Sequence, residues 1–263
     1  MMNDSVLLID KQEGIATLTL NRPNVMNALS TQLIFAITQG FEEIMRDDQI
    51  GVIILTGAGK AFCCGLDLKE LASITASKAV NELNNAANAC FNTLQKIDIP
   101  IIGAINGYAT TGGFELALAC DILIASSTAL FADTHARVGI MPGAGLSQKL
   151  SRMIGIGRAK ELSLTGNYLD AEKAERWGLV NRVVPPDELL PVCRELAKNI
   201  ASCDKQMIIR YKALIDQGYS TTLSEGMELE LKIHHEVNHG NATRFDASRR
   251  IALQQRGRDQ TKG

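Results

Sequence analysis

Several features that assign chains to special classes are missing from this sequence of 263 residues. No apolar run approaches the roughly 18 residues that a membrane-spanning helix requires. The formal net charge is only −2, so no overall field attracts nucleic acid or an anionic membrane surface. The N-terminal stretch MMNDSVLLIDKQEG lacks the basic region that precedes the apolar run of a secretory signal. We therefore expect a cytoplasmic protein with no nucleic-acid and no membrane partner.

Motifs for disulfides and metal ions are also scarce. The six cysteines include no C-x-x-C pair, and the adjacent Cys63 and Cys64 are poorly spaced to bind one metal ion. We expect free thiols that act as small apolar side chains in a reducing compartment. Residues 235–239 read HEVNH, a literal H-E-x-x-H zinc motif. A zinc peptidase needs a third ligand, but neither His nor Glu follows residue 240. We favour a polar helix face and predict no metal.

What the sequence does contain is an alternation of short apolar runs and helical patterns. Strand–helix–strand order favours parallel pairing with crossover helices, and so an α/β fold. An antiparallel strand pair is predicted to turn at Glu13-Gly14. The predicted strands are 5–10, 14–20, 51–57, 99–107, 121–126, 129–133 and 179–184. The predicted helices are 31–48, 76–96, 157–164, 170–177, 186–201, 204–217, 222–239 and 242–256, in addition to one that starts at the glycine pair 112–113.

Residues 110–121 read TTGGFELALACD, where two glycines open an apolar helix and Glu115 lies in its first turn. A helix N-terminus presents unpaired N–H groups and a partial positive charge. Glycine at 112 and 113 lets a ligand oxygen approach these groups closely. Such donors stabilise charge that develops on a carbonyl oxygen, and a carboxylate beside them handles a proton. The alternative is that the glycines permit tight packing and Glu115 only complements the helix dipole.

A second glycine-rich stretch, LTGAGKAFCCGLDLKEL at 55–71, follows a predicted buried strand, as ligand-binding loops on parallel sheets do. It is not a nucleotide-binding P-loop, because Ile54 and Ala61 stand where that motif requires Gly and Ser or Thr. Two loops at strand ends, each with a backbone N–H to offer, are able to form a two-donor oxyanion hole.

Three stretches in this order and spacing, AFCCGLDLKEL, NGYATTGGFELALACD and FADTHARVGIMPGAGLSQKL, resemble the crotonase (enoyl-CoA hydratase/isomerase) superfamily. LTLNRPNVMNALS and LTGNYLDAEKAERWGLVNRVV match it as well, and the resemblance covers roughly residues 6–200. It implies an α/β fold, a crotonase-like spiral of ββα units with a helical C-terminal region. It also implies an acyl-CoA thioester substrate, no cofactor besides the coenzyme A of that substrate, and a homotrimer or dimer of trimers. The implied division is an acyl-CoA-binding catalytic core at 1–200 and a helical oligomerisation region at 201–263.

The resemblance implies roles for individual residues too. The backbone N–H groups of Leu66 and Gly112 resemble the pair that binds the thioester oxygen. Glu115 has the position of the first catalytic carboxylate. The implied substrate-binding residues, which include the path of the CoA moiety, are Cys64, Leu66, Asp67, Leu68, Lys69, Gly112 and Gly113.

One stretch departs from the family pattern. Family hydratases have a second glutamate in a sequence resembling F-x-x-P-E-x-x-x-G, and this chain has Thr134 and His135 in place of its Pro and Glu. Water addition to an enoyl thioester needs a base for the water and an acid that delivers a proton to C2. Glu115 is the expected base. His135 is the expected second catalytic residue, because histidine titrates near neutral pH.

Alternatives stay open at this point. If His135 only packs or forms hydrogen bonds, a single carboxylate remains, and that is sufficient for double-bond isomerisation. A catalytically weak acyl-CoA-binding protein is the non-enzymatic alternative. The basic tail is either a solvated helix face or a set of contacts to CoA phosphates, in the same or a neighbouring subunit. Its arginines are Arg249, Arg250, Arg256 and Arg258.

Overall fold

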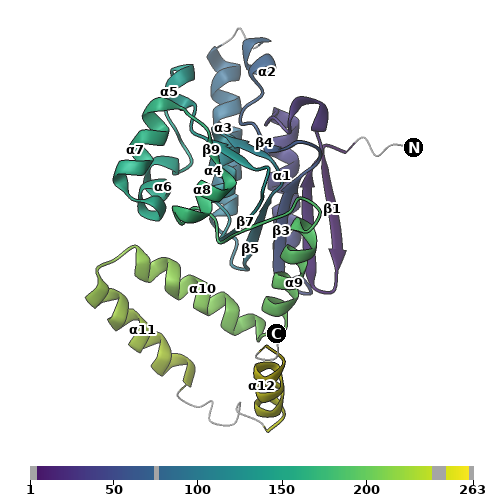
Figure 1. The fold of residues 1–263 in the computed structure, drawn as a ribbon, viewed down its shortest axis with the longest axis vertical. Helices are drawn as coiled ribbons and strands as arrows, with labels where there is room; N and C mark the ends of the chain where they lie inside the picture. The colour runs from purple at the N-terminus through teal and green to yellow at the C-terminus, as the bar shows by residue number, and fades with distance from the viewer. Residues whose placement is uncertain (1–4, 74–76, 239–246, 261–263) are drawn as a thin grey trace. The chain divides into compact units, whose positions relative to one another are not determined.

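The computed structural model describes residues 5–73, 77–238 and 247–260. It has the predicted mixture of strands and helices (Figure 1). By its internal contacts the chain divides into two compact units, Met1–Ile209 and Arg210–Gly263. The sequence-based boundary between residues 200 and 201, and the oligomerisation role of the second region, stay predictions.

The larger sheet of the first unit has the strand order β1-β2-β3-β5-β7-β10. Strands β2, β3, β5, β7 and β10 pair in parallel, and β1 pairs antiparallel with β2. Glu13 and Gly14 connect β1 to β2 with φ of 51° and 76°, a left-handed pair typical of tight hairpin turns. The predicted turn is thus confirmed. The strands span β1 Leu7–Gln12, β2 Ile15–Leu20, β3 Val52–Gly57, β5 Ile101–Ile105, β7 Ile122–Ser126 and β10 Arg182–Val184.

The longer helices lie close to their predicted ranges. Leu33 N donates a hydrogen bond to the Ser30 side chain at 3.2 Å, so Ser30 caps the first long helix, α1. The helices of the first unit are α1 Thr31–Met45, α2 Leu68–Ser73, α3 Ser77–Leu94, α4 Gly112–Leu118, α5 His135–Val138, α6 Leu146–Ile154, α7 Ile156–Thr165, α8 Ala171–Arg176 and α9 Leu189–Ala201, with a short 3-10 helix η1 at Pro23–Val25.

Helices α2, α5 and α6 are not among the predicted ones. In α6 the buried residues Leu146, Leu150 and Ile154 recur every four positions, which is a helical period. The helix has nine residues and lies between Gly145 and Gly155, so its glycine-rich flanks favour a loop when the sequence is considered alone. The other two have six and four residues, too few to show any periodicity.

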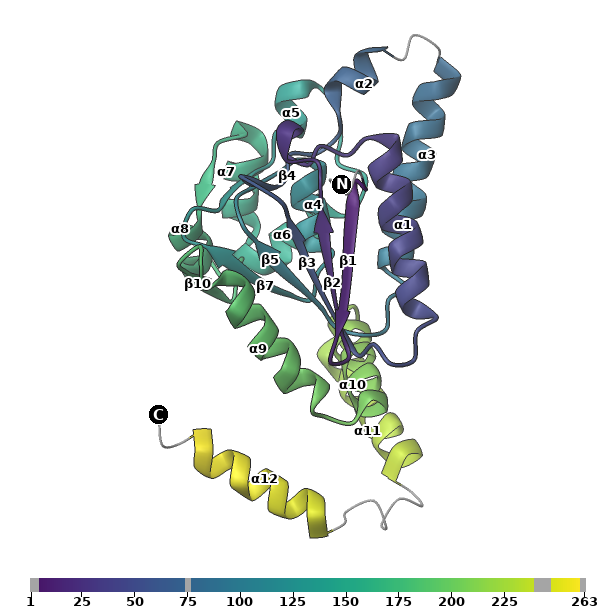
Figure 2. The same ribbon diagram turned by 90° about the vertical axis from the view of Figure 1, so that its right-hand side faces the viewer.

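Side-chain alternation along the larger sheet divides its apolar residues between two cores. Val52 and Ile54 of β3 pack in one core with residues of α9. Ile53 and Leu55 of the same strand belong to the other core, together with residues of α1. Neighbouring residues of a strand point to opposite faces, so α1 and α9 cover opposite faces of the sheet (Figure 2). Coverage on both sides explains why β3 is apolar throughout rather than alternating.

A smaller sheet of four short strands has the order β4-β6-β8-β9. Its strands span β4 Ala61–Cys63, β6 Tyr108–Thr110, β8 Leu130–Ala132 and β9 Leu169–Asp170. β6 pairs in parallel with both β4 and β8, whereas β9 is antiparallel to β8. The sequence predicts β8 as a strand but not β4, β6 or β9, since two or three residues within glycine-rich or polar surroundings give no clear strand pattern.

The second unit contains helices only, within its described residues. α10 spans Lys205–Tyr219 and extends across the boundary between the units, α11 spans Leu223–Asn238 and α12 spans Ala247–Gln260. No residue of α10 is buried. None of the described helices combines the length and the apolar character needed to cross a membrane. Large apolar side chains exposed along α10 and α11 are Tyr211, Ile215, Tyr219, Leu223, Met227 and Leu231.

All six cysteines are free thiols, and they differ in exposure. Burial raises the pKa of the Cys63 and Cys193 thiols to about 12. It raises the pKa of Cys90 to about 11. These three thiols are therefore protonated at neutral pH and pack as small apolar groups. Cys203, just after α9, is exposed.

Candidate active site

The carboxyl ends of three short parallel strands bring the predicted site residues together. β4 is followed by Leu66, β6 by Gly112 and Glu115, and β8 by His135. β6 and β8 are in register to their ends, where Thr110 pairs with Ala132, and β4 pairs with β6 through a register shift between Ala61 and Cys63. Parallel strands that pair side by side end at one edge of their sheet, which is where ligands bind in open α/β sheets. The predicted catalytic and oxyanion-hole residues therefore lie at a common edge.

Two backbone N–H groups at this edge have no acceptor among the described residues. Leu66 faces Leu29 in an isolated parallel bridge. Its neighbours Gly65 and Asp67 make the bridge hydrogen bonds, so the Leu66 N–H points to the opposite side. Gly112 begins α4, where N–H groups have no acceptor within the helix. A Cβ built on Gly112 would lie 3.9 Å from Leu66 N, so the two donors border the same space.

The two glycines at the start of α4 have different roles. A Cβ on Gly113 would lie 1.9 Å from the carbonyl oxygen of Cys63, so this glycine is required for α4 to pack against β4. A Cβ on Gly112 would meet nothing closer than Leu29 Cδ1 at 3.5 Å. The packing alternative considered for the glycines therefore holds for Gly113. Only the absence of a side chain at 112 keeps the space between the N–H donors open.

Thr111, which precedes the glycines, has a strained backbone with φ of 54° and ψ of −118°. Positive φ is rare for a β-branched residue and opposes folding by about 1–3 kcal/mol. Two hydrogen bonds hold this conformation: Thr111 N donates to Ala132 O at 3.0 Å, and the Thr111 hydroxyl is bonded to that of Thr134. Thr134, which stands where the family pattern has proline, thus fixes the turn from which Gly112 N points.

Glu115 is almost completely buried, with 5% of its surface exposed. Ala144 N donates a hydrogen bond to its Oε1 at 2.7 Å, and the first turn of α4 adds a partial positive charge. A buried carboxylate needs compensation of this kind. Its second oxygen, Oε2, faces the ring of His135 at 3.7 Å from Nε2. That oxygen makes no hydrogen bond within the described residues, which suits it to accept a proton.

His135 connects Glu115 to a third ionisable side chain. Its Nδ1 lies 2.7 Å from Oδ1 of Asp133, whereas the 3.7 Å from Nε2 to Glu115 Oε2 is longer than a hydrogen bond. Both His135 and Asp133 are buried, so three ionisable groups form one buried row. Asp133 is not among the sequence-predicted site residues. The signal for it is an aspartate two positions before the histidine, directly after a strand.

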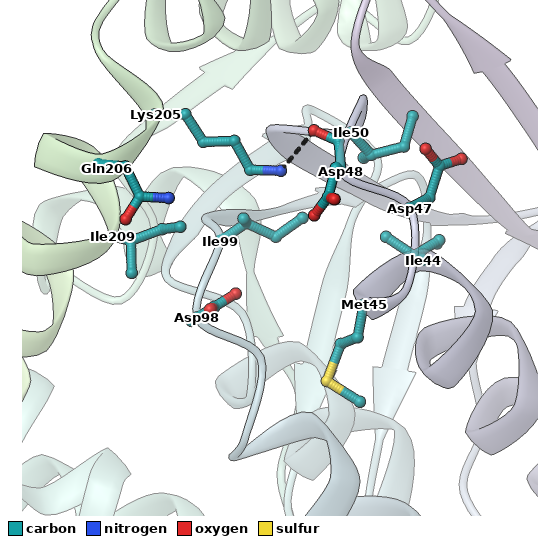
Figure 3. A pocket seen from close by; sticks show the side chains of 10 residues that line it. All are labelled: Ile44, Met45, Asp47, Asp48, Ile50, Asp98, Ile99, Lys205, Gln206 and Ile209. Atoms are coloured by element: carbon teal, nitrogen blue, oxygen red, sulfur yellow. Dashed lines mark hydrogen bonds between the residues drawn. The ribbon is translucent and has the colours of Figure 1, made fainter.

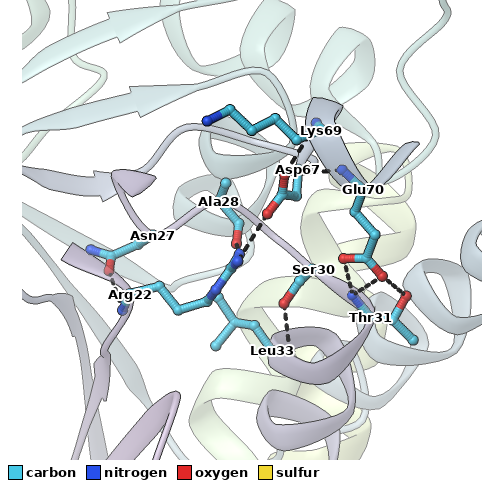
Figure 4. Close-up of polar contacts among 9 residues, drawn as sticks. All are labelled: Arg22, Asn27, Ala28, Ser30, Thr31, Leu33, Asp67, Lys69 and Glu70. Carbon is cyan, nitrogen blue, oxygen red and sulfur yellow. Dashed lines mark hydrogen bonds and ion pairs between the residues drawn. The ribbon is translucent and has the colours of Figure 1, made fainter. Parts of the chain in front are cut away.

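A polar network braces the loop that holds Leu66 (Figure 4). The guanidinium of Arg22 donates to Asp67 Oδ2 at 2.9 Å and to the carbonyl of Ala28. The other oxygen of Asp67 accepts from the N–H groups of Lys69 and Glu70, at 3.2 and 3.3 Å, and so caps α2. Burial alone would raise the pKa of the Asp67 carboxyl, but these hydrogen bonds lower it below its usual range.

The same network extends to the N-terminus of α1. Thr31 N donates to Glu70 Oε2 at 3.1 Å, and the Thr31 hydroxyl donates to Oε1. The ammonium group of Lys69 points away from the network (Figure 4), and the side chains of Leu68 and Lys69 are exposed. Cys64 is half-buried, and its carbonyl accepts from the Thr110 hydroxyl at 3.1 Å. The substrate-binding roles of these residues stay predictions.

A cavity of about 380 Å³ lies elsewhere in the first unit (Figure 3). Asp47 and Asp48 precede β3, and Asp98 precedes β5, so the cavity lies at the amino ends of the parallel strands. Lys205 is the one cation among its lining residues, and its Nζ donates to Asp48 O at 2.8 Å. Because parallel sheets bind ligands at the carboxyl ends of their strands, we do not assign this cavity to the active site.

The zinc-motif alternative gains no support from the described residues. His235 lies on α11, its ring 5.7 Å from that of His234, and His239 lies outside the described residues. Nowhere in the described ranges do three His, Cys, Asp or Glu side chains form a group able to hold a metal ion. The tail arginines belong to α12, and their contact with CoA phosphates stays a prediction.

Comparisons with known proteins give consistent matches over nearly the whole chain. The profile of the enoyl-CoA hydratase/isomerase family matches residues 10–251. The probable enoyl-CoA hydratase 1, peroxisomal, of Arabidopsis thaliana is 40% identical over 237 residues, which cover 89% of this chain and 87% of the relative. The crotonyl-CoA hydratase of Syntrophomonas wolfei is 36% identical, over 85% of this chain and 86% of the relative. A crystal structure of enoyl-CoA hydratase from Bacillus anthracis has a TM-score of 0.86 at 35% identity, covering 97% of this chain and 96% of that one.

Proposed function

Because the chain belongs to the enoyl-CoA hydratase/isomerase family, as its motifs predict, we propose that it is an enzyme that adds water across the 2,3 double bond of a trans-2-enoyl-CoA thioester. Relatives that cover most of the chain are named as hydratases. The observation that supports hydration most directly is the pair of buried proton-handling groups, Glu115 and His135, 3.7 Å apart. Hydration needs a base and an acid, and this pair supplies both.

The thioester carbonyl oxygen accepts hydrogen bonds from Leu66 N and Gly112 N. When water attacks C3, the electrons of the double bond move toward that oxygen and an enolate forms. Fixed donors that need no reorganisation stabilise this charge, and each is worth about 3–4 kcal/mol of barrier. The support for this step is that neither N–H has another acceptor among the described residues.

The protons balance over one turnover. Glu115 Oε2 takes a proton from water as the water oxygen bonds to C3. His135 Nε2 gives a proton to C2, and the enolate electrons form the new C–H bond. Glu115 then holds one proton more and His135 one fewer. The 3.7 Å between Oε2 and Nε2 allows the proton to return after a small side-chain movement, and the sum is the addition of one water.

The experiment follows the ultraviolet absorbance of the conjugated enoyl thioester, with chains of several lengths. We expect the wild type to consume this absorbance. In Glu115→Gln and His135→Gln, kcat should fall by about 10²-fold or more, the usual contribution of a proton-handling residue, while acyl-CoA still raises Tm. The exposed Glu172 on α8 offers a matched control, since Glu172→Gln should keep full activity.

Other outcomes identify the alternatives. An enzyme that consumes no trans-2-enoyl-CoA but creates its absorbance from a 3-enoyl-CoA is an isomerase, and its activity would survive His135→Gln. A raised Tm with acyl-CoA and no turnover of either substrate would identify a binding protein. Either result would overturn the hydratase proposal.

We also propose that the protein acts as a homotrimer or a dimer of trimers in the cytoplasm, with no cofactor other than the CoA of its substrate. Support for assembly comes from the second unit alone. Its helices α10 and α11 expose large apolar side chains, among them Tyr219 at 66% and Leu223 at 82%, and exposed apolar surface rimmed by polar residues is typical of protein interfaces. Light scattering should give a mass of three or six chains, and a monomer would contradict the proposal.

A further inference from the structure

We propose that Asp133 is a positioning residue that holds the ring of His135 with a proton on Nδ1, so that Nε2 is the nitrogen that exchanges protons with the substrate and with Glu115. The inference deepens the proposed function and rests on it for its kinetic consequences. The juxtaposition itself, a buried row of Asp133, His135 and Glu115, is a feature of the structure.

Two hydrogen bonds connect Asp133 to His135. The backbone N–H of His135 donates to Asp133 Oδ1 at 3.2 Å, and Nδ1 lies 2.7 Å from the same oxygen. The first bond fixes the histidine backbone relative to the carboxylate, and the second fixes the rotation of the ring. With Nδ1 held in this way, Nε2 on the far side of the ring points toward Glu115.

The charge of Asp133 decides where the ring proton lies. Burial alone would raise the pKa of this carboxyl, but hydrogen bonds from His135 and from the Ser163 side chain lower it below its usual range. An ionised carboxylate only accepts hydrogen bonds. At 2.7 Å from such an acceptor, Nδ1 must be the donor. In the neutral ring the lone pair is then on Nε2, and in the charged ring Nε2 has the transferable proton.

Burial makes this arrangement strong. Asp133 is 2% exposed and His135 is 5% exposed, so little water screens the pair. An unpaired buried carboxylate would oppose folding, and here the histidine and the Ser163 hydroxyl on α7 satisfy it. The carboxylate contacts Nδ1 and leaves Nε2 available to the substrate.

The neighbouring charges fit the same assignment. Among the described residues, the ionisable side chains that face the ring are Glu115 from α4 and Asp133 from the turn before α5. Arg137, two residues further along α5, directs its guanidinium to the Thr165 carbonyl at 2.7 Å instead. Helix α7, which packs on α5, contributes the neutral Ser163 hydroxyl. Carboxylate groups thus lie on both sides of the ring, Asp133 at Nδ1 and Glu115 toward Nε2.

The direct test is nitrogen-15 NMR of the wild-type protein labelled at its four histidines, with His135 assigned by comparison with His135→Gln. We expect Nδ1 of His135 to be protonated at every pH at which the ring is neutral. A neutral ring with its proton on Nε2 would overturn the inference, whatever the enzyme catalyses. A wild type that hydrates no enoyl-CoA would instead overturn the proposed function, so the two failures are distinguishable.

The kinetic test uses Asp133→Asn. We expect kcat to fall by about 10²-fold with little change in KM, because the ring is no longer held in the orientation that presents Nε2 to the substrate. Asp133→Glu should recover part of the activity. Ser163→Ala removes a donor to the same carboxylate but leaves its charge, and we expect kcat within about threefold of wild type.

A double-mutant cycle separates positioning from a merely structural role. If Asp133 acts through the ring, Asp133→Asn should change kcat less than about twofold when His135 is already Gln. An equal fold loss in both backgrounds would overturn the inference. Should Asp133→Asn fail to fold, the wild-type NMR measurement decides the question.

Discussion

The two ends of the parallel strands in the first unit differ in how their charged side chains are accommodated. At the carboxyl ends, Glu115, His135 and Asp133 are almost fully buried, and each has a named partner. At the amino ends, Asp48 and Asp98 are exposed at the rim of a cavity of about 380 Å³. The carboxylates of Asp48 and Asp98 lie in water and need no partner, whereas the charges at the carboxyl ends persist only because each is compensated.

This difference shows that buried ionisable side chains identify a candidate active site better than the presence of a cavity does. Burying an ionised group opposes folding by several kcal/mol unless partners satisfy it. Three such groups in one row are therefore informative, whereas a roomy cavity lined by solvated acids is not. The expected effects of substitution should follow the same order, with large losses at the carboxyl ends and small ones at the amino ends.

The largest effect in this comparison is expected for Gly113→Ala. The new methyl would lie 1.9 Å from Cys63 O, and neither backbone is able to yield without separating α4 from β4. We expect a loss of about 3 kcal/mol or more in the free energy of unfolding, measured by urea denaturation. Gly112→Ala is the matched control. It should fold with about 1 kcal/mol or less lost, yet lower kcat/KM, because its methyl enters the space between the N–H donors. Equal stability of the two variants would mean that Gly113 is not specifically required for α4 to pack against β4.

Asp67→Asn should have an intermediate effect. It removes the charge that pairs with Arg22 at 2.9 Å and weakens the brace of the Leu66 loop, so we expect about 2 kcal/mol of lost stability and a lower kcat. The pKa of Asp67 is lowered by folding. Its contribution is thus complete above the ordinary carboxyl pKa and is lost as pH falls through the lowered value. The stability gap between wild type and variant should close in acid. A gap that widens in acid would refute this account, and Glu43→Gln at an exposed ion pair is the control.

The smallest effects belong to the amino ends. Lys205→Met removes one hydrogen bond to Asp48 O and should reduce stability by at most about 1 kcal/mol. Asp98→Asn should stay within about 0.5 kcal/mol of wild type. Both should keep kcat/KM within about twofold. A large loss of turnover in either variant would show that the amino ends of the strands belong to the active site, and would contradict the difference between the two ends.

Much of the fold is predictable from the sequence because its signals are local. The Glu13-Gly14 turn, the Ser30 cap and the buried strand at 52–57 each follow from the chemistry of a few adjacent residues. The smaller sheet is not predictable in this way. Its three-residue strands β4 and β6 are defined by pairing with each other across more than 40 residues of sequence, and no local pattern encodes that pairing.

The site shows the same division. The resemblance implies roles for Leu66, Gly112, Glu115 and His135, and the fold brings these residues to one sheet edge, but their chemical roles stay predictions. Asp133 was missed because an isolated aspartate after a strand has many uses, and only the fold reveals that its carboxylate meets Nδ1 of His135. The sequence alone also does not show why residue 113 must be glycine, because the Cys63 carbonyl that it accommodates lies 50 positions earlier in the chain.

The cysteines have a practical consequence for watching this enzyme at work. At neutral pH only a thiolate reacts readily with an alkylating dye, and burial keeps the Cys63 and Cys193 thiols protonated. Cys203, exposed after α9, lies outside the buried row of Asp133, His135 and Glu115 and is the natural attachment point for a fluorophore. A single dye there would report on the junction before α10 during turnover, without chemistry at that row.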